Sequence, residues 1–249
     1  MRVNIKFFLF LAVVCFPFQT NAENIFFKRH ETISTSRSCS KKWTPLFVNA
    51  KDTIHWQSIA EKTFPNDGWQ ITQDELILLS GNRGGDIITK KRYSNFELKL
   101  EFRMTRLVNS GVKYFVLQMK NERNGKIEWI GYEYQIIDDF HQDEIRGFDD
   151  DRRSTAALYL LYAPSKKKHL KPLGEWNSLS IKVKNNRIEH WLNGIKVISI
   201  KTNIQDFENQ VKKTKFVNYK DYHKKNEGHI LIQDHGSEIH YRNIQIKEL

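Results

Sequence analysis

The chain has 249 residues, of which 40 are Lys or Arg and 29 are Asp or Glu, so its formal net charge at neutral pH is +11. A chain of this length can bury one large core, and all-β sandwiches of this size are commonly single domains. The positive charge gathers in short runs within predicted loops, and no zinc-finger spacing, basic helix or RNA-binding signature accompanies it. This pattern indicates solvated loops and predicts no nucleic-acid partner.

The first 22 residues have the features of a secretory signal peptide. A basic head, Met1–Lys6, precedes an apolar run, Phe7–Phe18, and small residues around Ala22 provide a cleavage site. The run is too short for a spanning helix, and no later apolar run is long enough to be one. Val14 before Cys15 is a poor match to a lipoprotein cleavage site, so a lipid anchor is the minor alternative. We therefore expect export to the periplasm or the exterior.

Residues 23–43 are polar and irregular and are predicted to form a flexible leader, with the folded domain at 44–249. After cleavage the chain retains only Cys39, so no intramolecular disulfide can form. The stability of the domain must therefore come from its hydrophobic core.

Short alternating stretches follow one another through the domain. Phe96–Met104 alternates apolar and polar residues throughout, which is typical of a strand with one face in the core. Asn109–Gly111, Asn124-Gly125 and Asn193-Gly194 are turn or hairpin signals, and residues 203–227 are predicted to be mostly loop. Further strands are predicted at 46–48, 76–79, 86–90, 112–117, 129–139, 156–162, 179–183, 188–192, 195–200, 229–233 and 239–246. Because helical periodicity is almost absent, we predict an all-β jelly-roll sandwich of two antiparallel sheets.

The stretch Trp129–Asp139 carries the clearest chemical signal. Glu133 and Gln135 share one face of the predicted strand, whereas Tyr132 and Tyr134 point to the other. A carboxylate and a carboxamide beside an aromatic face favour a groove that hydrogen-bonds a hydroxyl-rich ligand. The alternative is a half-exposed strand whose polar face is only solvated.

A second polar pair, Gln233 and His235, alternates in the same way near the end of the chain. Two such strands could bring Glu133 close to His235, and a carboxylate and an imidazole in a partly dry groove are suited to proton transfer. His190 and Trp191 point to opposite faces of their strand, so only one can lie in a groove. Trp191 would be a sugar-stacking platform or, equally, a core aromatic residue.

Asp138, Asp139 and His141 form a cluster of hard ligands that could hold a divalent metal ion. Such a cluster is more often a polar loop, and both interpretations stand at this point. No Ser/His/Asp or Cys/His nucleophile set is evident.

The domain contains several motifs in a fixed order: Gly85–Lys90, Tyr93–Arg103, Asn109–Gly111, Tyr132–Asp138, Leu158-Tyr159, Gly174–Asn177, His190–Gly194, Lys215-Phe216, Gly228–Gly236 and Arg242–Ile244. In this order they resemble the 3-keto-disaccharide hydrolase domain, also described as 3-keto-glucoside lyase/hydratase. The resemblance covers about residues 44–249. One departure is Ala156, which stands where the family is expected to have Gly.

The resemblance implies a concanavalin A-like jelly roll related to the laminarinase-type glucanases. It also implies action on glycosides whose sugar carries a ketone at carbon 3. Such a ketone acidifies the hydrogen on carbon 2, so a base can remove it. The enediolate then expels the group on carbon 1, and water adds to the resulting enone. We expect Glu133 and His235 to be the base/acid pair.

The remaining site residues are assigned on the same basis. Gln135, grouped with the catalytic pair, is expected to position hydroxyls, and Lys90 or Arg103 to lie near the enolate, where a divalent ion could also serve. The full set of expected substrate contacts is Lys90, Glu101, Arg103, Asn109, Trp191, Asn193 and Gln233.

Two other functions remain open. A direct glycosidase with two carboxylates is disfavoured because Gln135 stands at the middle of the alternating positions where the laminarinase-type sites carry acids. A carbohydrate-binding domain without catalysis is the alternative from another class, because a fold of this kind does not decide function.

Overall fold

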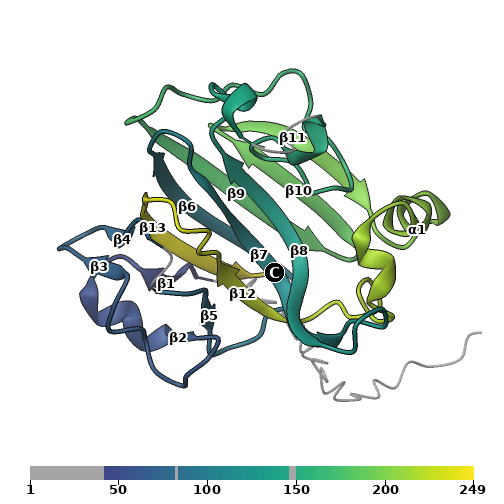
Figure 1. Cartoon of the computed structure of the whole chain (residues 1–249), viewed down its shortest axis with the longest axis horizontal. Helices are drawn as coiled ribbons and strands as arrows, with labels where there is room; N and C mark the ends of the chain where they lie inside the picture. Colours follow the sequence, from purple (N-terminus) through teal and green to yellow (C-terminus); the bar gives the residue numbers. More distant parts are fainter. Residues whose placement is uncertain (1–41, 82–83, 146–149) are drawn as a thin grey trace, which may run out of the picture. The chain divides into compact units, whose positions relative to one another are not determined.

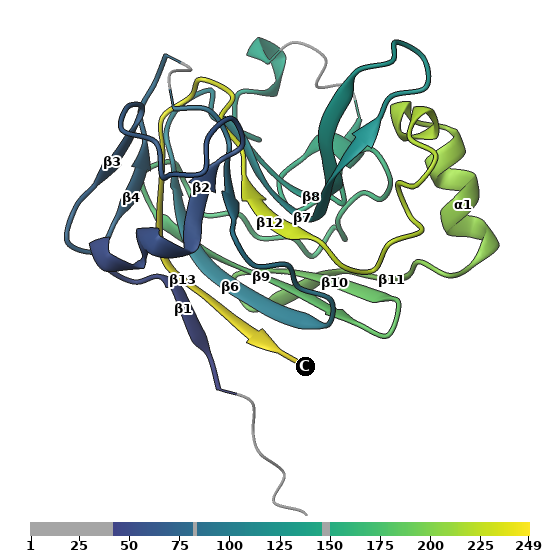
Figure 2. The same cartoon turned by 90° about the horizontal axis from the view of Figure 1, so that it is seen from below.

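The protein folds into two stacked antiparallel β-sheets (Figures 1 and 2). The computed structural model describes residues 42–81, 84–145 and 150–249. The strands are β1 (Thr44–Phe47), β2 (Trp56–Ser58), β3 (Trp69–Ile71), β4 (Leu76–Leu78), β5 (Ile87–Thr89), β6 (Phe96–Met104), β7 (Asn109–Lys120), β8 (Ile127–Ile137), β9 (Trp176–Lys184), β10 (Arg187–Leu192), β11 (Ile195–Lys201), β12 (His229–Ile232) and β13 (Ile239–Glu248). The larger sheet has the order β11-β10-β9-β6-β13-β4-β3, with β1 also paired to β13, and the smaller sheet has the order β2-β5-β12-β7-β8.

Within residues 42–81, 84–145 and 150–249, helical structure is confined to short connections. The helix α1 (Gln205–Lys212) follows β11, and four 3₁₀ turns occupy Ala50–His55, Gln142–Glu144, Asp151–Arg153 and Lys215–Asn218. Within the residues that the structure describes, no helix is long and apolar enough to cross a bilayer.

The core lies between the two sheets because each strand buries alternate residues. In β6, Phe96 and Phe102 are fully buried, whereas Glu97 and Arg103 lie on the outer face. In β8, Tyr132 and Tyr134 enter the core, where the Tyr134 ring lies 4.7 Å from the imidazole of His190. The predicted jelly-roll sandwich is confirmed.

A β-bulge at Phe115 shapes the middle of the smaller sheet. Phe115 adopts φ +56°, and the register between β7 and β8 shifts after Tyr114. A Cβ on Gly131 would lie 2.5 Å from the Tyr114 carbonyl oxygen, and one on Gly228 would lie 2.2 Å from the Phe115 carbonyl carbon. Both glycines are therefore required by the close approach of the bulged backbone.

One local prediction is wrong and another is incomplete, because tertiary contacts override local patterns. Asn109–Gly111 is not a turn: it begins β7, and the chain turns just before it, where Val108 N–H donates to the Thr105 carbonyl. Residues 203–227, predicted to be mostly loop, contain α1, whose Phe207 and Val211 are buried.

The segment 156–162 is also not a regular strand. It forms isolated bridges, Tyr134 to Leu158 and Leu158 to Tyr162, within a series of turns. Ala156 has φ +72°, a conformation that glycine adopts without strain, so the position where Gly was expected is one where the backbone favours it. The predicted signal peptide and most of the predicted leader fall at 1–41, outside the described residues.

Candidate active site

Strands β7 and β8 place a carboxylate, an ammonium group and a carboxamide on the outer face of the smaller sheet. Glu133 and Gln135 alternate with core tyrosines, as the sequence predicts, and both face away from the core. In the β7–β8 register, Lys113 is paired with Glu133 and Gly111 with Gln135. Side chains of directly opposed residues point to the same face, so Lys113 and Glu133 are neighbours.

These strands line a cavity of about 170 Å³. Five of the residues predicted from the sequence meet there, namely Asn109, Glu133, Gln135, Gln233 and His235. Six further residues complete the lining: Lys113, Ile137, Ile145, Arg153, Tyr159 and Lys215. The expected proximity of Glu133 and His235 is therefore a property of the fold, whereas their catalytic roles stay predictions.

Gly111 makes room for this cavity. A Cβ at this position would lie 3.0 Å from Glu133 Oε1 and 3.3 Å from Gln233 Oε1. Both distances are tighter than ordinary van der Waals contact, so a larger residue would displace one of these groups. The absence of a side chain at Gly111 keeps a carboxylate and a carboxamide oxygen close together without forcing either out of position.

Glu133 is buried but unpaired. Its side chain is buried, with a residue exposure of 8%, and within the described part of the chain its carboxylate makes no hydrogen bond or ion pair. Burial raises the pKa of Glu133, and the positive charges of Lys113 and Lys215 act in the opposite direction. A carboxylate with a raised pKa in a partly dry cavity is suited to accept or donate a proton.

The amide side chains leave hydrogen-bonding capacity facing the cavity. Gln135 donates from Nε2 to Asn109 Oδ1 at 3.2 Å. Its Oε1 and that of Gln233 are buried, and neither has a hydrogen-bond partner among the residues that the structure describes. Buried acceptors are normally satisfied, so two open carbonyl oxygens at one cavity indicate a ligand that donates hydrogen bonds.

Backbone bonds hold the loop that carries His235. β12 ends at Ile232, and Gln233 remains anchored to β7 because its N–H donates to the Gly111 carbonyl at 3.0 Å. Asp234 N–H donates to Asp86 Oδ1 at 2.8 Å, and the Asp234 carboxylate accepts from the N–H groups of Gly85 and Gly236. The loop is thereby fixed on both sides of His235.

Four charged or hydroxyl-bearing residues of the cavity were not assigned a role from the sequence. Lys113 continues the alternation of β7, which is the signal that could have identified it. Lys215 lies with its Nζ 5.2 Å from the Tyr159 ring centre, and Arg153 Nη1 donates to Tyr159 Oη at 3.5 Å. Burial raises the pKa of Tyr159, and Glu133 acts in the same direction. Desolvation lowers the pKa of Lys215 despite the attraction of Glu133.

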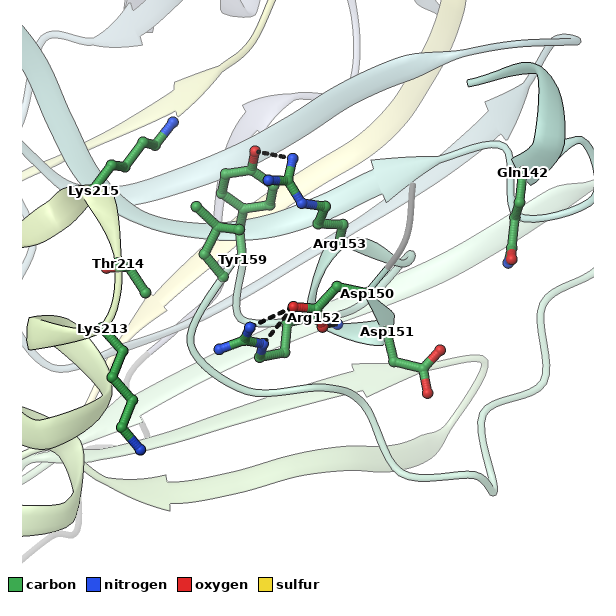
Figure 3. Close-up of a pocket in the computed structure, with 10 residues that line it drawn as sticks. Gln142, Asp150, Asp151, Arg152, Arg153, Tyr159, Lys213, Thr214 and Lys215 are labelled. Atoms are coloured by element: carbon green, nitrogen blue, oxygen red, sulfur yellow. Dashed lines mark hydrogen bonds and ion pairs between the residues drawn. The ribbon is translucent and has the colours of Figure 1, made fainter. Parts of the chain in front are cut away.

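A wider cleft of about 1120 Å³ adjoins this cavity and shares Arg153, Tyr159 and Lys215 with it. Figure 3 shows the Tyr159 hydroxyl, the Arg153 guanidinium and the Lys215 ammonium at one end of this cleft, while the Lys213 side chain extends away from them. Arg152 and Asp150, which also line this cleft, pair with each other (Figure 3). A ligand in the cavity would thus have space beside it for a second group.

Five residues predicted as substrate contacts lie away from the cavity. Lys90 is exposed just after β5. Glu101 and Arg103 face outward from the larger sheet, where they pair with Arg242 and Glu75. Glu101 and Arg103 lie away from the cavity because β6 belongs to the larger sheet, whereas the cavity is built on the smaller one.

The last two predicted contacts also belong to the larger sheet. Trp191 is half-buried on its outer face, and His190 is in the core, where its Nε2 lies 2.9 Å from Tyr114 Oη. Neither residue lines the cavity. Asn193 has φ +48° in the tight turn before β11, and its side chain bonds to the His169 carbonyl and to the Ser178 N–H, so its role is structural.

The predicted metal ligands are engaged with the protein itself. Asp138 is fully buried and accepts from the N–H groups of Leu107 and Phe140 and from His141 Nδ1. Asp139 accepts from the Thr155 N–H and from Lys168 Nζ. Across the described ranges, no group of three or more His, Cys, Asp or Glu residues is arranged to hold a metal ion. These donors do not fit a divalent cation, whose carboxylate ligands must be available to it.

Comparison with known proteins places the chain among its relatives. The family model for the 3-keto-alpha-glucoside-1,2-lyase-like domain matches residues 42–247. A Bacteroides thetaiotaomicron protein named 3-keto-disaccharide hydrolase is 29% identical over 222 residues, which cover 78% of this chain and 74% of that protein.

Two crystal structures from Parabacteroides distasonis, both of provisionally assigned glycosyl hydrolases, are similar. One has a TM-score of 0.68 at 28% identity and covers 83% of this chain and 94% of its own. The other has a TM-score of 0.62 at 26% identity, with coverages of 84% and 100%. The chain belongs to the family of 3-keto-alpha-glucoside-1,2-lyase-like domains.

Proposed function

We propose that this protein is an exported carbohydrate-active enzyme that cleaves 3-keto-glycosides by proton abstraction at carbon 2, elimination and hydration. Family membership and the name of the Bacteroides relative support the substrate class. The observation that carries the proposal is Glu133, an unpaired carboxylate with a raised pKa in a cavity that also holds Lys113 and Lys215.

In the first step Glu133 acts as the base. It takes the proton from carbon 2, and the electron pair of the broken C–H bond forms an enolate with its negative charge on the oxygen of carbon 3. The raised pKa makes Glu133 a stronger base than an exposed carboxylate. The ammonium groups of Lys113 and Lys215 stabilise the developing charge, and the Tyr159 hydroxyl can donate a hydrogen bond to it.

In the second step the enolate re-forms the ketone, a double bond forms between carbons 1 and 2, and the bond from carbon 1 to the leaving oxygen breaks. His235 supplies the proton to that oxygen. Water then adds its hydroxyl to carbon 1 while its other proton returns to His235, and Glu133 returns a proton to carbon 2. The net reaction is hydrolysis of the glycoside.

The amide groups account for recognition of the sugar. Gln135 and Gln233 each present a carbonyl oxygen that has no partner in the described part of the protein, and sugar hydroxyls are donors that can satisfy both. Asn109 orients Gln135 through the bond to its Oδ1. An apolar ligand would leave both buried acceptors unsatisfied, so the cavity favours a ligand with several hydroxyl groups.

The lining disfavours two other routes. Among the described residues of the cavity Glu133 is the single carboxylate, whereas direct hydrolysis by the usual glycosidase route needs two. Lys113, Lys215 and Arg153 line the same space, and cations are poor neighbours for a metal ion. Lysine therefore stabilises the enolate, and no step of the reaction goes through a metal.

The test is turnover of a 3-keto-glucoside by the purified protein and by Glu133→Gln. We expect the variant to lose about 10²- to 10⁴-fold in kcat. Glu101→Gln, on the outer face of the larger sheet, is the matched control and should retain full activity. A chelator should not reduce turnover. Sugar binding without release by the wild-type protein would instead support the carbohydrate-binding alternative.

We further propose that residues 1–22 are removed on export. The basic head and apolar run support this assignment. Mass spectrometry of the protein isolated from its native cells should find Glu23 as the first residue, and an uncleaved chain in the cytoplasmic fraction would contradict export.

A further inference from the structure

A second hollow lies on the outer face of the larger sheet, away from the catalytic cavity. It is a groove of about 810 Å³, within the range of small-molecule sites, and its lining includes Trp43, Lys99, Glu101, Ser180, Trp191 and Gln245. Figure 2 shows the strands that form its base, β6, β9, β10 and β13, as a layer separate from β7, β8 and β12. Glu101 and Trp191, predicted from the sequence as sugar contacts, both lie in this groove.

Serines form the floor of the groove. Ser180 on β9 is paired with Lys99 on β6 and with Trp191 on β10, so the three residues form one row across the sheet. Strands are spaced by about 4.8 Å, which separates Lys99 from Trp191 by about 10 Å across the small Ser180. Ser178 is the next outward-facing residue on β9 and also lines the groove. The hollow exists because the central strand carries small hydroxyl side chains between larger neighbours.

Two half-buried indoles flank this floor. Trp43 lies with its ring centre 4.5 Å from Lys99 Nζ and 4.7 Å from Lys247 Nζ. Trp191 has Lys196 Nζ 5.3 Å from its ring centre and donates from Nε1 to Glu189 at 3.3 Å. These contacts hold both rings against the sheet. Partly exposed, fixed tryptophans offer apolar faces to a ligand at little cost in conformational entropy.

Three of the four charged residues that line the groove, Glu97, Lys99 and Glu101, are matched within the protein. Glu97 pairs with Lys99 and Lys247, and Glu101 accepts from Arg242 Nε at 2.7 Å and from Asn243 Nδ2 at 2.8 Å. A charged ligand would have to compete with these pairs.

The uncharged polar groups are instead open. In the described part of the chain, the hydroxyls of Ser178 and Ser180 and the amide of Gln245 have no protein hydrogen bond. Neutral hydrogen-bonding groups between two indole faces match a ligand with both hydroxyls and apolar C–H faces.

We propose that this groove is a second carbohydrate site, which binds a neutral oligosaccharide outside the catalytic cavity. The site holds polymeric or oligomeric sugar on the surface of the protein and takes no part in the bond cleavage. It stands on the geometry of the outer face alone, so it does not depend on the reaction proposed for Glu133.

The test is calorimetric titration of the full protein with cellohexaose, laminarihexaose and maltohexaose. At least one hexasaccharide should bind, and Trp191→Ala should weaken that binding by roughly tenfold or more. Ser180→Lys fills the floor from a solvent-facing position and should do the same without disturbing the core. Trp176→Phe, on the same face but outside the lining, is the matched control and should bind as the wild type does. Neither groove variant should change turnover of a small 3-keto-glucoside.

Three results would overturn the proposal. The first is the absence of binding to all three hexasaccharides. The second is binding that Glu133→Gln abolishes and the groove variants leave unchanged, which would place the sugar in the catalytic cavity only. The third is a wild-type dimer in sedimentation velocity that Ser180→Lys converts to a monomer, which would show that a second copy of the chain occupies the groove.

Discussion

Lys113 on β7 and Glu133 on β8 are directly opposed across the smaller sheet, and both line the cavity on its outer face. Of the groups that lower the pKa of Glu133, Lys113 has the largest effect, although burial outweighs it and the pKa remains raised. Lys113 therefore favours the charged form of Glu133, whereas burial disfavours it. It also provides a positive charge next to the position where a proton would be removed.

Replacing Lys113 by Met should change the pH profile of catalysis. Loss of the ammonium group raises the pKa of Glu133 further, so the acidic limb of kcat/KM, which reports deprotonation of the base, should move to higher pH. The rate on the plateau should also fall, because the enolate loses a stabilising charge. Lys182→Met, on the outer face of the larger sheet, should leave both unchanged. An acidic limb that stays in place would show that Glu133 is not the titrating base.

Gly111→Ala should reduce activity without unfolding the protein. The added methyl would lie 3.0 Å from Glu133 Oε1 and 3.1 Å from its Cγ, so the carboxylate must shift by a few tenths of an ångström. A displacement on that scale at a reacting group can cost roughly tenfold or more in kcat. Steady-state kinetics and a thermal melt separate the two effects. Wild-type kinetics in Gly111→Ala would mean that the position of Glu133 is unimportant.

Asp234→Ala should loosen the loop that carries His235. The Asp234 carboxylate accepts from the N–H groups of Gly85 and Gly236, and the alanine variant leaves both without this partner. We expect kcat to fall more than KM rises, because the misplaced group acts in the reaction. Asp234→Asn retains one acceptor oxygen and should recover part of the loss. Equal kinetics in the alanine variant and the wild type would show that the loop is held by other contacts.

The folding stability should depend on pH through His190. Burial lowers the pKa of His190 from 6.5 to about 4, and its Nδ1 lies 3.1 Å from the Ala156 carbonyl oxygen. Between these two pH values the unfolded chain binds a proton that the folded protein does not. Stability from this group is therefore full above pH 6.5 and is lost as the pH falls towards 4, by about 3 kcal/mol in total.

Urea unfolding at pH 7.5 and pH 4.5 measures this effect. His190→Gln removes the titration, so the variant should be less stable than the wild type at pH 7.5 but should lose less stability between the two pH values. His223→Gln is the control for an imidazole outside the core. An identical loss in His190→Gln and the wild type would assign the acid sensitivity to other groups.

Alternation in the sequence was sufficient to predict the sandwich and half of the cavity. Glu133, Gln135 and Gln233 were found because each strand repeats every two residues and buries one face, a rule that needs no knowledge of the partner strand. The same rule placed Glu101 and Arg103 outside the core correctly, but it could not show which of the two sheets β6 would join. The sheet that β6 joins is decided by long-range strand pairing. Because β6 joins the larger sheet, both residues lie away from the cavity.

The missing half of the cavity comes from irregular segments. Tyr159 lies in a series of turns, and Lys215 begins a 3₁₀ turn after α1, so neither has a periodic pattern that predicts its direction. Tyr159 is held in place because its backbone N–H donates to the Glu133 carbonyl at 3.0 Å. This contact joins two segments that are distant in the sequence, so no local pattern predicts it. Asp138 illustrates the opposite error: its residue type suggests a metal ligand, but its oxygens are used to close a loop.

The most direct test of the proposed reaction is turnover of a 3-keto-glucoside in deuterated water, followed by mass spectrometry and NMR of the released sugar. Proton abstraction by Glu133 and later return of a solvent-derived proton predict one deuterium at carbon 2 of the 3-keto sugar. The Glu133→Gln variant should release almost none of this product. Rapid release with hydrogen retained at carbon 2 would contradict elimination and would instead indicate direct cleavage of the glycosidic bond.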